Sequence, residues 1–197
     1  MVDKHTLIRG MKEYAEKNNV PIMVDDGINF LTTFILKKHV KNILEIGTAI
    51  GYSAIMMALV DPNVKVTTIE RDEVRYLEAL KNVKEFGLED RITLIYNDAF
   101  NVKLTEKFDL IFIDAAKAQS IKFFEMFERN LVHGGAIITD NLEFHGLVDK
   151  KEEEIKSRNL RALIRKIKDY INYLKENEKY DTEFFEVGDG ISVSVKK

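Results

Sequence analysis

Two patterns of hydrophobic and polar positions divide the chain into a helical start and a longer alternating part. In residues 4–17 apolar side chains recur every three or four positions, which predicts an amphipathic helix. The same spacing follows the acidic turn at residues 25–27 and predicts a second helix that runs toward His39. We therefore expect residues 1–40 to form N-terminal helices and residues 41–197 to form an α/β core.

From residue 42 onward, short β-rich runs alternate with helical segments, and this alternation indicates a mostly parallel sheet with helices on both faces. The predicted strands are residues 43–46, 64–69, 92–96, 110–113 and 136–139. The predicted helices are residues 53–59, 73–86 and 120–130. Near the C-terminus, residues 184–187 and 191–195 flank a glycine-rich turn, which predicts a closing antiparallel hairpin.

The composition is typical of one globular domain that spans residues 1–197. Hydrophobic residues make up 45% of the chain and charged residues 32%, and no Pro/Gly/Ser-rich linker divides it. No apolar run approaches the roughly 20 residues that span a bilayer, and residues 1–20 lack the apolar core of a signal peptide. We expect a cytoplasmic protein without a membrane partner. Because the chain has no cysteine, a metal would need oxygen or imidazole ligands.

A glycine-punctuated turn follows the first predicted strand. Gly47 and Gly51 let the chain turn sharply and let a ligand lie against the main chain at the start of the next helix. Ala49 stands where a dinucleotide fingerprint has its second glycine, which argues against a dehydrogenase. Glu70 ends the next strand, where α/β nucleotide folds place a carboxylate for ribose hydroxyls. These residues indicate a nucleotide-type cofactor; a packing glycine and a solvated glutamate are the alternative.

Acidic and amide side chains end two later strands. Asp114 follows four apolar residues, and Asp140 and Asn141 follow another apolar run. Two carboxylates and an amide oxygen are hard ligands that suit Mg²⁺, Mn²⁺ or Ca²⁺, although Asp and Asn also occur as helix caps and in turns. Lys117 lies three residues after Asp114 and is either a proton acceptor beside the metal or a solvated surface lysine.

These motifs together resemble the cation-dependent class I O-methyltransferases, the family of catechol and caffeoyl-CoA O-methyltransferases. The resemblance runs from Pro21 to the C-terminus through EIGTAIGYS, TIERD, NDAF, FIDAAKAQ, GGAIITDN and VGDGISVSVKK, and the DAAK and DN elements are its specific part. It implies the Rossmann-like fold of S-adenosylmethionine-dependent methyltransferases and a homodimer. It also implies donor binding, Mg²⁺ binding by Asp114, Asp140 and Asn141, and catalysis by Asp114 with Lys117 as the base. The implied donor-binding residues are Met23, Glu45, Gly47, Ser53, Glu70, Asp98, Ala99 and Asp114.

Within this family the chain resembles in particular the bacterial enzymes that methylate 5-hydroxyuridine at the wobble position of tRNA. VPIM, EIGTAIGYSAI, IERDE, FGLEDR and RNLRALIRKI carry this resemblance. It implies 5-methoxyuridine as the product and the tRNA anticodon loop as the partner. A 5-hydroxyl beside a 4-carbonyl presents two adjacent oxygens to a metal, as a catechol does. A small-molecule catechol or caffeoyl-CoA type O-methyltransferase is the alternative, and a nucleotide-sensing module without turnover is another.

A basic stretch lies between residues 156 and 168. Its residues Arg158, Arg161, Arg165 and Lys168 share one face of a predicted helix, with no acidic residue in the stretch. Phosphate contact is one interpretation of this face, and a solvated helix or a dimer contact is the other. His145 follows the DN element and is a candidate for the wall of the acceptor pocket.

Overall fold

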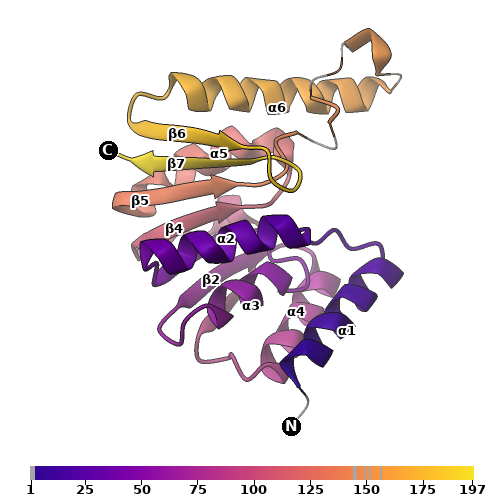
Figure 1. The fold of residues 1–197 in the computed structure, drawn as a ribbon, viewed down its shortest axis with the longest axis vertical. Helices are drawn as coiled ribbons and strands as arrows, with labels where there is room; N and C mark the ends of the chain where they lie inside the picture. Colours follow the sequence, from indigo (N-terminus) through magenta and orange to yellow (C-terminus); the bar gives the residue numbers. More distant parts are fainter. Residues whose placement is uncertain (1–2, 144–145, 149, 151, 156) are drawn as a thin grey trace.

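The computed structural model describes residues 3–143, 146–148, 150, 152–155 and 157–197. Its centre is a seven-stranded sheet of order β3-β2-β1-β4-β5-β7-β6 (Figure 1). Strands β1 to β5 pair in parallel, whereas β7 runs antiparallel to both β5 and β6. The strands are β1 Asn42–Ile46, β2 Lys65–Glu70, β3 Ile92–Tyr96, β4 Phe108–Ile113, β5 Leu131–Thr139, β6 Tyr180–Phe185 and β7 Ile191–Lys196. The predicted fold class, mostly parallel α/β with a C-terminal antiparallel hairpin, is confirmed.

Helices cover both faces of this sheet, as the alternation of elements predicts. The α-helices are α1 Lys4–Lys17, α2 Asp25–Lys38, α3 Tyr52–Leu59, α4 Glu73–Glu85, α5 Ser120–Phe127 and α6 Arg158–Glu176. Short 3₁₀ turns complete the set: η1 Ala99–Asn101, η2 Lys117–Gln119, η3 Glu128–Asn130 and η4 Glu152–Glu154. None of the helices in the described part of the chain is long and apolar enough to cross a membrane.

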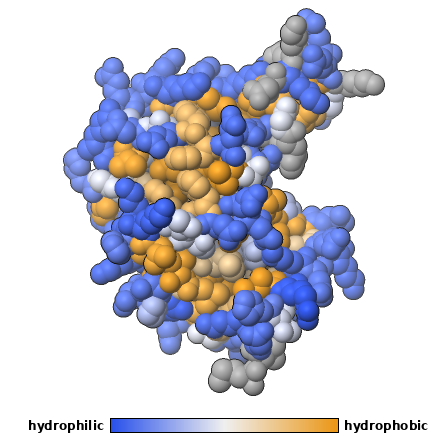
Figure 2. Space-filling model, viewed as in Figure 1, coloured by the Kyte–Doolittle hydropathy of each residue, from blue (hydrophilic) through white to orange (hydrophobic). Residues whose placement is uncertain are grey.

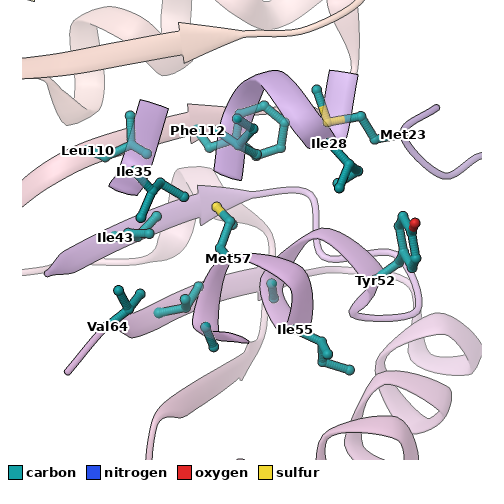
Figure 3. Packing of buried hydrophobic residues seen from close by; sticks show 14 of the residues in the cluster. Met23, Ile28, Ile35, Ile43, Tyr52, Ile55, Met57, Val64, Leu110 and Phe112 are labelled. Atoms are coloured by element: carbon teal, nitrogen blue, oxygen red, sulfur yellow. The ribbon is translucent and has the colours of Figure 1, made fainter. Parts of the chain in front are cut away.

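The hydrophobic core consists of two layers, one on each face of the sheet. Side chains of successive strand residues point to opposite faces, so Leu110 and Phe112 of β4 join one layer and Ile111 and Ile113 join the other. Helices α1, α2 and α3 supply the first layer, in which Ile35 and Met57 pack against β1 and β4 (Figure 3). Helices α5 and α6 supply the second layer. The sheet is therefore buried along its centre, and its polar strand ends are the positions that remain for a ligand.

Two strands differ by more than two residues from their predicted ranges, and the other strands begin and end within two residues of them. β5 begins at Leu131 rather than residue 136. Its register with β4 shifts between the pair of Phe108 with Leu131 and the pair of Leu110 with Ala136, and the residues of β5 between these pairs include two glycines. β6 covers Tyr180–Phe185 rather than residues 184–187. This edge strand pairs only with β7 and carries exposed acidic residues on one face. Its sequence therefore lacks the continuous apolar run by which the central strands are predicted.

The carboxyl ends of the central strands are held together by main-chain hydrogen bonds that continue past the strands. The Asp114 amide donates to the Ile46 carbonyl at 3.0 Å, and the Gly47 amide donates to the Ile69 carbonyl at 3.1 Å. The ends of β1, β2 and β4 are consequently in register. Open α/β sheets bind ligands at this edge.

Candidate active site

A pocket of about 590 Å³ lies at the carboxyl ends of β1, β2, β4 and β5. Ten of the residues singled out in the sequence line it: Met23, Gly47, Ser53, Glu70, Asp98, Ala99, Asp114, Lys117, Asp140 and Asn141. The sheet edge thus brings the predicted donor-binding turn at Gly47 together with the predicted metal ligands, the last of which, Asn141, lies 94 positions later in the chain. Glu45 is the one predicted donor-binding residue that does not line the pocket.

The turn after β1 can be built only with glycine at its first position. Gly47 has φ of +100°, and a Cβ placed there would lie 2.1 Å from the carbonyl oxygen of Asp114. Ala49 also adopts a left-handed conformation, with φ of +47°. Its amide donates a 2.8 Å hydrogen bond to Oε2 of Glu70. The turn is therefore pressed against the end of β4 on one side and held by the end of β2 on the other.

Glu70 fixes this turn and also lines the pocket. Its Oε1 accepts hydrogen bonds of 2.9 Å from the amides of Arg71 and Asp72, in addition to the bond from Ala49 at Oε2. A carboxylate has about four lone-pair sites, so after these three bonds about one remains for a hydroxyl group of a ligand. This geometry suits the predicted role of Glu70 toward a ribose.

Glu45 lies behind the pocket wall. Its carboxylate is fully buried and accepts hydrogen bonds from the hydroxyls of Ser53 and Thr68. Burial raises the pKa of Glu45 to about 8, although the two hydroxyls act in the opposite direction. The pocket itself meets the Ser53 side of this pair, so Glu45 orients Ser53 in this structure rather than facing the pocket.

The strand-end acids and Lys117 form a charged group at the other end of the pocket. Lys117 Nζ donates to Oδ1 of Asp114 at 2.9 Å. Asp140 is almost fully buried; this burial and the nearby negative charge of Asp114 raise its pKa to about 7, while Lys117 opposes the rise. Asn141 has φ of +61°, and its side-chain amide lies 3.2 Å from Oδ2 of Asp140.

This donor set fits a divalent cation. The described residues contain no cluster of three or more His, Cys, Asp or Glu side chains, so a cation here depends on the amide oxygen of Asn141 beside two carboxylates. The amide oxygen and nitrogen are interchangeable by rotation of the side chain. A cation would relieve the repulsion between Asp114 and Asp140, and hard oxygen ligands match Mg²⁺ or a similar ion.

Asp98 and Ala99 lie beside β3, at the end of the pocket next to Glu70. Asp98 caps η1 by accepting a 3.0 Å hydrogen bond from the Phe100 amide, and its other oxygen is 3.7 Å from an Arg71 nitrogen. Phe100 stacks on Phe123, with ring centroids 4.8 Å apart. Because Phe123 also lines the pocket, this end offers a flat apolar wall beside a carboxylate.

Several lining residues lie outside the sequence prediction. Tyr52 neighbours the predicted Ser53, Arg71 directly follows Glu70, and Arg75 lies in the first turn of α4. Gly188 and Asp189 come from the turn between β6 and β7, which the sequence indicates only as a hairpin. Residues 21–24 of the segment between α1 and α2 also contribute, although Met23 alone is predicted. Periodicity gives no signal for such loops.

The basic residues of α6 lie outside the pocket lining. Ser157 caps the helix, and α6 packs against η2, which carries Lys117. Arg161 donates a 2.8 Å hydrogen bond to the Ile155 carbonyl and is only partly exposed. Arg158 and Arg165 are exposed and Lys168 is half-buried. His145 lies outside the described residues.

The fold and the pocket are those of an α/β protein with a ligand pocket at the carboxyl ends of its parallel strands, and comparison with known proteins makes this class more specific. Residues 1–197 match the profile of the O-methyltransferase family, and the chain belongs to this family.

Relatives and solved structures agree with this assignment. A caffeoyl-CoA O-methyltransferase from Populus kitakamiensis is 28% identical over 190 residues, covering 92% of this chain and 80% of the relative. The crystal structure of a putative caffeoyl-CoA O-methyltransferase from Staphylococcus aureus is similar with 40% identity and a TM-score of 0.91, covering 96% of this chain and 92% of that one. The O-methyltransferase from Bacillus cereus in complex with SAH shares the fold, with 24% identity, a TM-score of 0.84, and coverage of 100% and 93%.

Proposed function

We propose that this protein transfers the methyl group of S-adenosylmethionine to a hydroxyl oxygen of an acceptor with two adjacent oxygens, with the help of a divalent cation. The observation that carries the proposal is that one pocket joins the Gly47 turn and Glu70 to Asp114, Lys117 and Asp140. The family supports O-methyl transfer, and the SAH complex from Bacillus cereus supports the donor.

The binding position of the methyl donor follows from the polar groups at the end of the pocket that contains the Gly47 turn and Glu70. The Gly47 turn leaves room for a ligand to approach the main chain, and Glu70 offers its remaining acceptor site to a ribose hydroxyl. Asp98 and the wall containing Phe123 suit the adenine ring, because one offers an acceptor and the other a flat apolar surface. The Ser53 hydroxyl, oriented by Glu45, is available to the amino acid part of the donor.

The acceptor's place follows from the charged group. Asp114, Asp140 and Asn141 would hold the cation, which when bound orients two acceptor oxygens and acidifies the hydroxyl. Lys117, held at Asp114, would accept the hydroxyl proton when its amine is neutral. Transfer of the methyl group from the sulfonium sulfur to this oxygen would leave S-adenosylhomocysteine, a methyl ether and a protonated Lys117.

As the acceptor we propose 5-hydroxyuridine at the tRNA wobble position, which becomes 5-methoxyuridine. Its 5-hydroxyl and 4-carbonyl are adjacent oxygens, and a base in the anticodon loop needs little unpairing to enter a pocket. The motif resemblance to bacterial tRNA enzymes supports this substrate. Helix α6, which carries the basic face, packs against the η2 turn that carries Lys117, so phosphate contacts on this helix would lie near the pocket.

A small catechol-like acceptor is the second candidate. The named relatives favour it, since they include caffeoyl-CoA O-methyltransferases and a flavonoid 3',5'-methyltransferase from Vitis vinifera that is 26% identical over 96% of this chain and 86% of that relative. Such an acceptor would use the same metal ligands and Lys117. It would make no use of the basic face of α6.

A homodimer in the cytoplasm completes the proposal. Apolar residues gather on one face of the molecule, around α2 and α3 and over β6 and β7 (Figure 2). Leu36 of α2 is 58% exposed and Phe184 of β6 is 40% exposed. Sedimentation equilibrium gives the mass directly: about twice the 22.8 kDa of the chain supports a pair, and the mass of one chain overturns it.

A methyl-transfer assay separates the two acceptors. The purified protein is incubated with labelled S-adenosylmethionine, Mg²⁺, and either tRNA that carries 5-hydroxyuridine or caffeoyl-CoA. Transfer to the tRNA alone supports the proposed acceptor, and transfer to caffeoyl-CoA alone supports the second candidate. Donor binding without transfer to either would favour a binding module.

A further inference from the structure

The segment between α1 and α2 forms one wall of the pocket but is weakly tied to the rest of the main chain. Residues 21–24 line the pocket and have no regular secondary structure. In the part of the chain that the structure describes, the main chain of residues 21–23 makes no hydrogen bond. Side chains must therefore hold this wall in place.

Two close contacts with glycines position the middle of the segment. Met23 packs on Gly27 of α2 so closely that a Cβ at Gly27 would lie 2.9 Å from the Met23 Cε atom. A Cβ at Gly188 would lie 3.1 Å from Val24 Cγ2. Met23 and Tyr52 lie at the same end of the hydrophobic layer in Figure 3, and both line the pocket.

The ammonium group of Lys12 in α1 contacts the first residues of both α2 and α3, next to the end of this segment. Lys12 of α1 donates a hydrogen bond to Asp25, the first residue of α2. The same ammonium lies 5.9 Å from the ring centre of Tyr52, the first residue of α3. The hydrogen bond with Asp25 raises the pKa of Lys12, so the group stays charged near neutral pH. Lys12 itself does not line the pocket.

We propose that Lys12 is a positioning residue for the pocket: by joining Asp25 and Tyr52 it holds residues 21–24 as the wall against which the methyl donor binds. This inference rests on the proposed donor. Lys12 acts through the wall and not on the reacting atoms. Its loss is therefore expected to weaken donor binding and to leave the rate of the saturated enzyme unchanged.

The test compares donor affinity among matched lysine variants. For Lys12→Met we expect the Kd for S-adenosylhomocysteine, measured by titration calorimetry, to rise by about fivefold, the upper range for an exposed ion pair. KM for the donor should rise equally while kcat stays constant. Lys12→Arg should keep most of the affinity because it keeps the charge, and Asp25→Asn should repeat the loss from the other side of the pair.

Lys81→Met is the control. Lys81 pairs with Glu78 at 2.9 Å and lies 6.0 Å from the ring centre of Tyr14, so it too links α1 to a neighbouring helix, but it does not touch residues 21–25. We expect wild-type affinity from this variant. The inference is overturned by unchanged affinity in Lys12→Met and Asp25→Asn, by an equal loss in Lys81→Met, or by an equal loss in Lys12→Arg. A wild-type protein that binds no S-adenosylhomocysteine contradicts the proposed donor instead.

Discussion

Lys117 and Asp114 are joined by a 2.9 Å hydrogen bond between Nζ and Oδ1, which ties the first residue of η2 to the residue that follows β4. Only 13% of the Lys117 side chain is exposed. The amine is thus held at the pocket in one place, beside the proposed metal ligand, rather than moving in solvent.

This relationship predicts the effect of Lys117→Met. Loss of a positioned base typically lowers a rate by about 10²- to 10⁴-fold, so kcat should fall in that range while the Kd for S-adenosylhomocysteine stays near the wild-type value. Lys117→Arg should not rescue the rate, because a guanidinium stays protonated. Lys122→Met, an exposed position on α5, is the control. Near-wild-type kcat in Lys117→Met would remove Lys117 from the chemistry.

The metal proposal predicts a cation requirement that depends on Asp140. EDTA should abolish methyl transfer, and added Mg²⁺ should restore it. In Asp140→Asn the Mg²⁺ concentration for half-maximal rate should rise by at least about tenfold, since even outer partners of metal ligands contribute this much. Asp109→Asn is a matched control, because Asp109 binds the amides of Lys41 and Asn42 at the opposite end of β4. Full activity in EDTA would refute the requirement.

The contact between Gly47 and Asp114 predicts a stability difference between two glycine substitutions. Gly87 has φ of +63° with no atom within 4 Å of a built Cβ, so Gly87→Ala tests the backbone conformation alone and should cost about 1 kcal/mol. Gly47→Ala adds a clash at 2.1 Å with the Asp114 carbonyl and should cost clearly more. Urea unfolding measures both. Equal losses would show that the strand ends can separate without penalty.

The buried carboxyl of Glu45 predicts how stability changes with pH. Its pKa is raised from 4.5 to about 8 in the folded chain, so between these values the unfolded chain releases a proton that the native chain keeps. The contribution of Glu45 to the free energy of unfolding is therefore present below about pH 4.5 and is lost as pH rises toward 8. Glu45→Gln should be progressively more stable relative to wild type from pH 5 to pH 8. A constant difference would contradict this.

The basic face of α6 predicts a selective effect on tRNA binding. Arg161 is tied to the Ile155 carbonyl, so its reversal would disturb the helix start, and Arg158 and Lys168 are the better positions to change. Replacing both by Glu should weaken tRNA binding and reduce the slope of log K against log salt by about 2. Affinity for S-adenosylhomocysteine should stay unchanged. Unchanged tRNA affinity at moderate salt would leave α6 without a role in binding.

Much of the fold and the pocket follows from sequence because one rule governs both. Parallel strands bring their carboxyl ends to one edge, so Glu70, Asp114 and Asp140 could be placed together from the ends of their apolar runs alone. The turn at Gly47 could be predicted as well, since a glycine directly after a buried strand typically marks a sharp turn at a ligand site.

Features that depend on loop geometry could not be predicted in this way. The position of Glu45 behind Ser53 depends on which face of β1 meets α3, and a strand-end acid looks the same in sequence whether it lines a pocket or supports its wall. The contributions of residues 21–24 and of Asp189 depend on how the irregular segment between α1 and α2 and the turn of the C-terminal hairpin fold over the sheet edge. No periodicity marks such segments, because their side chains do not repeat on one face.

The central claim is tested most directly by mass spectrometry of tRNA nucleosides from cells that lack this protein. We predict that 5-methoxyuridine disappears and 5-hydroxyuridine accumulates, and that the wild-type gene restores the normal profile while a Lys117→Met version does not. An unchanged content of 5-methoxyuridine in the deleted cells would contradict the proposed acceptor.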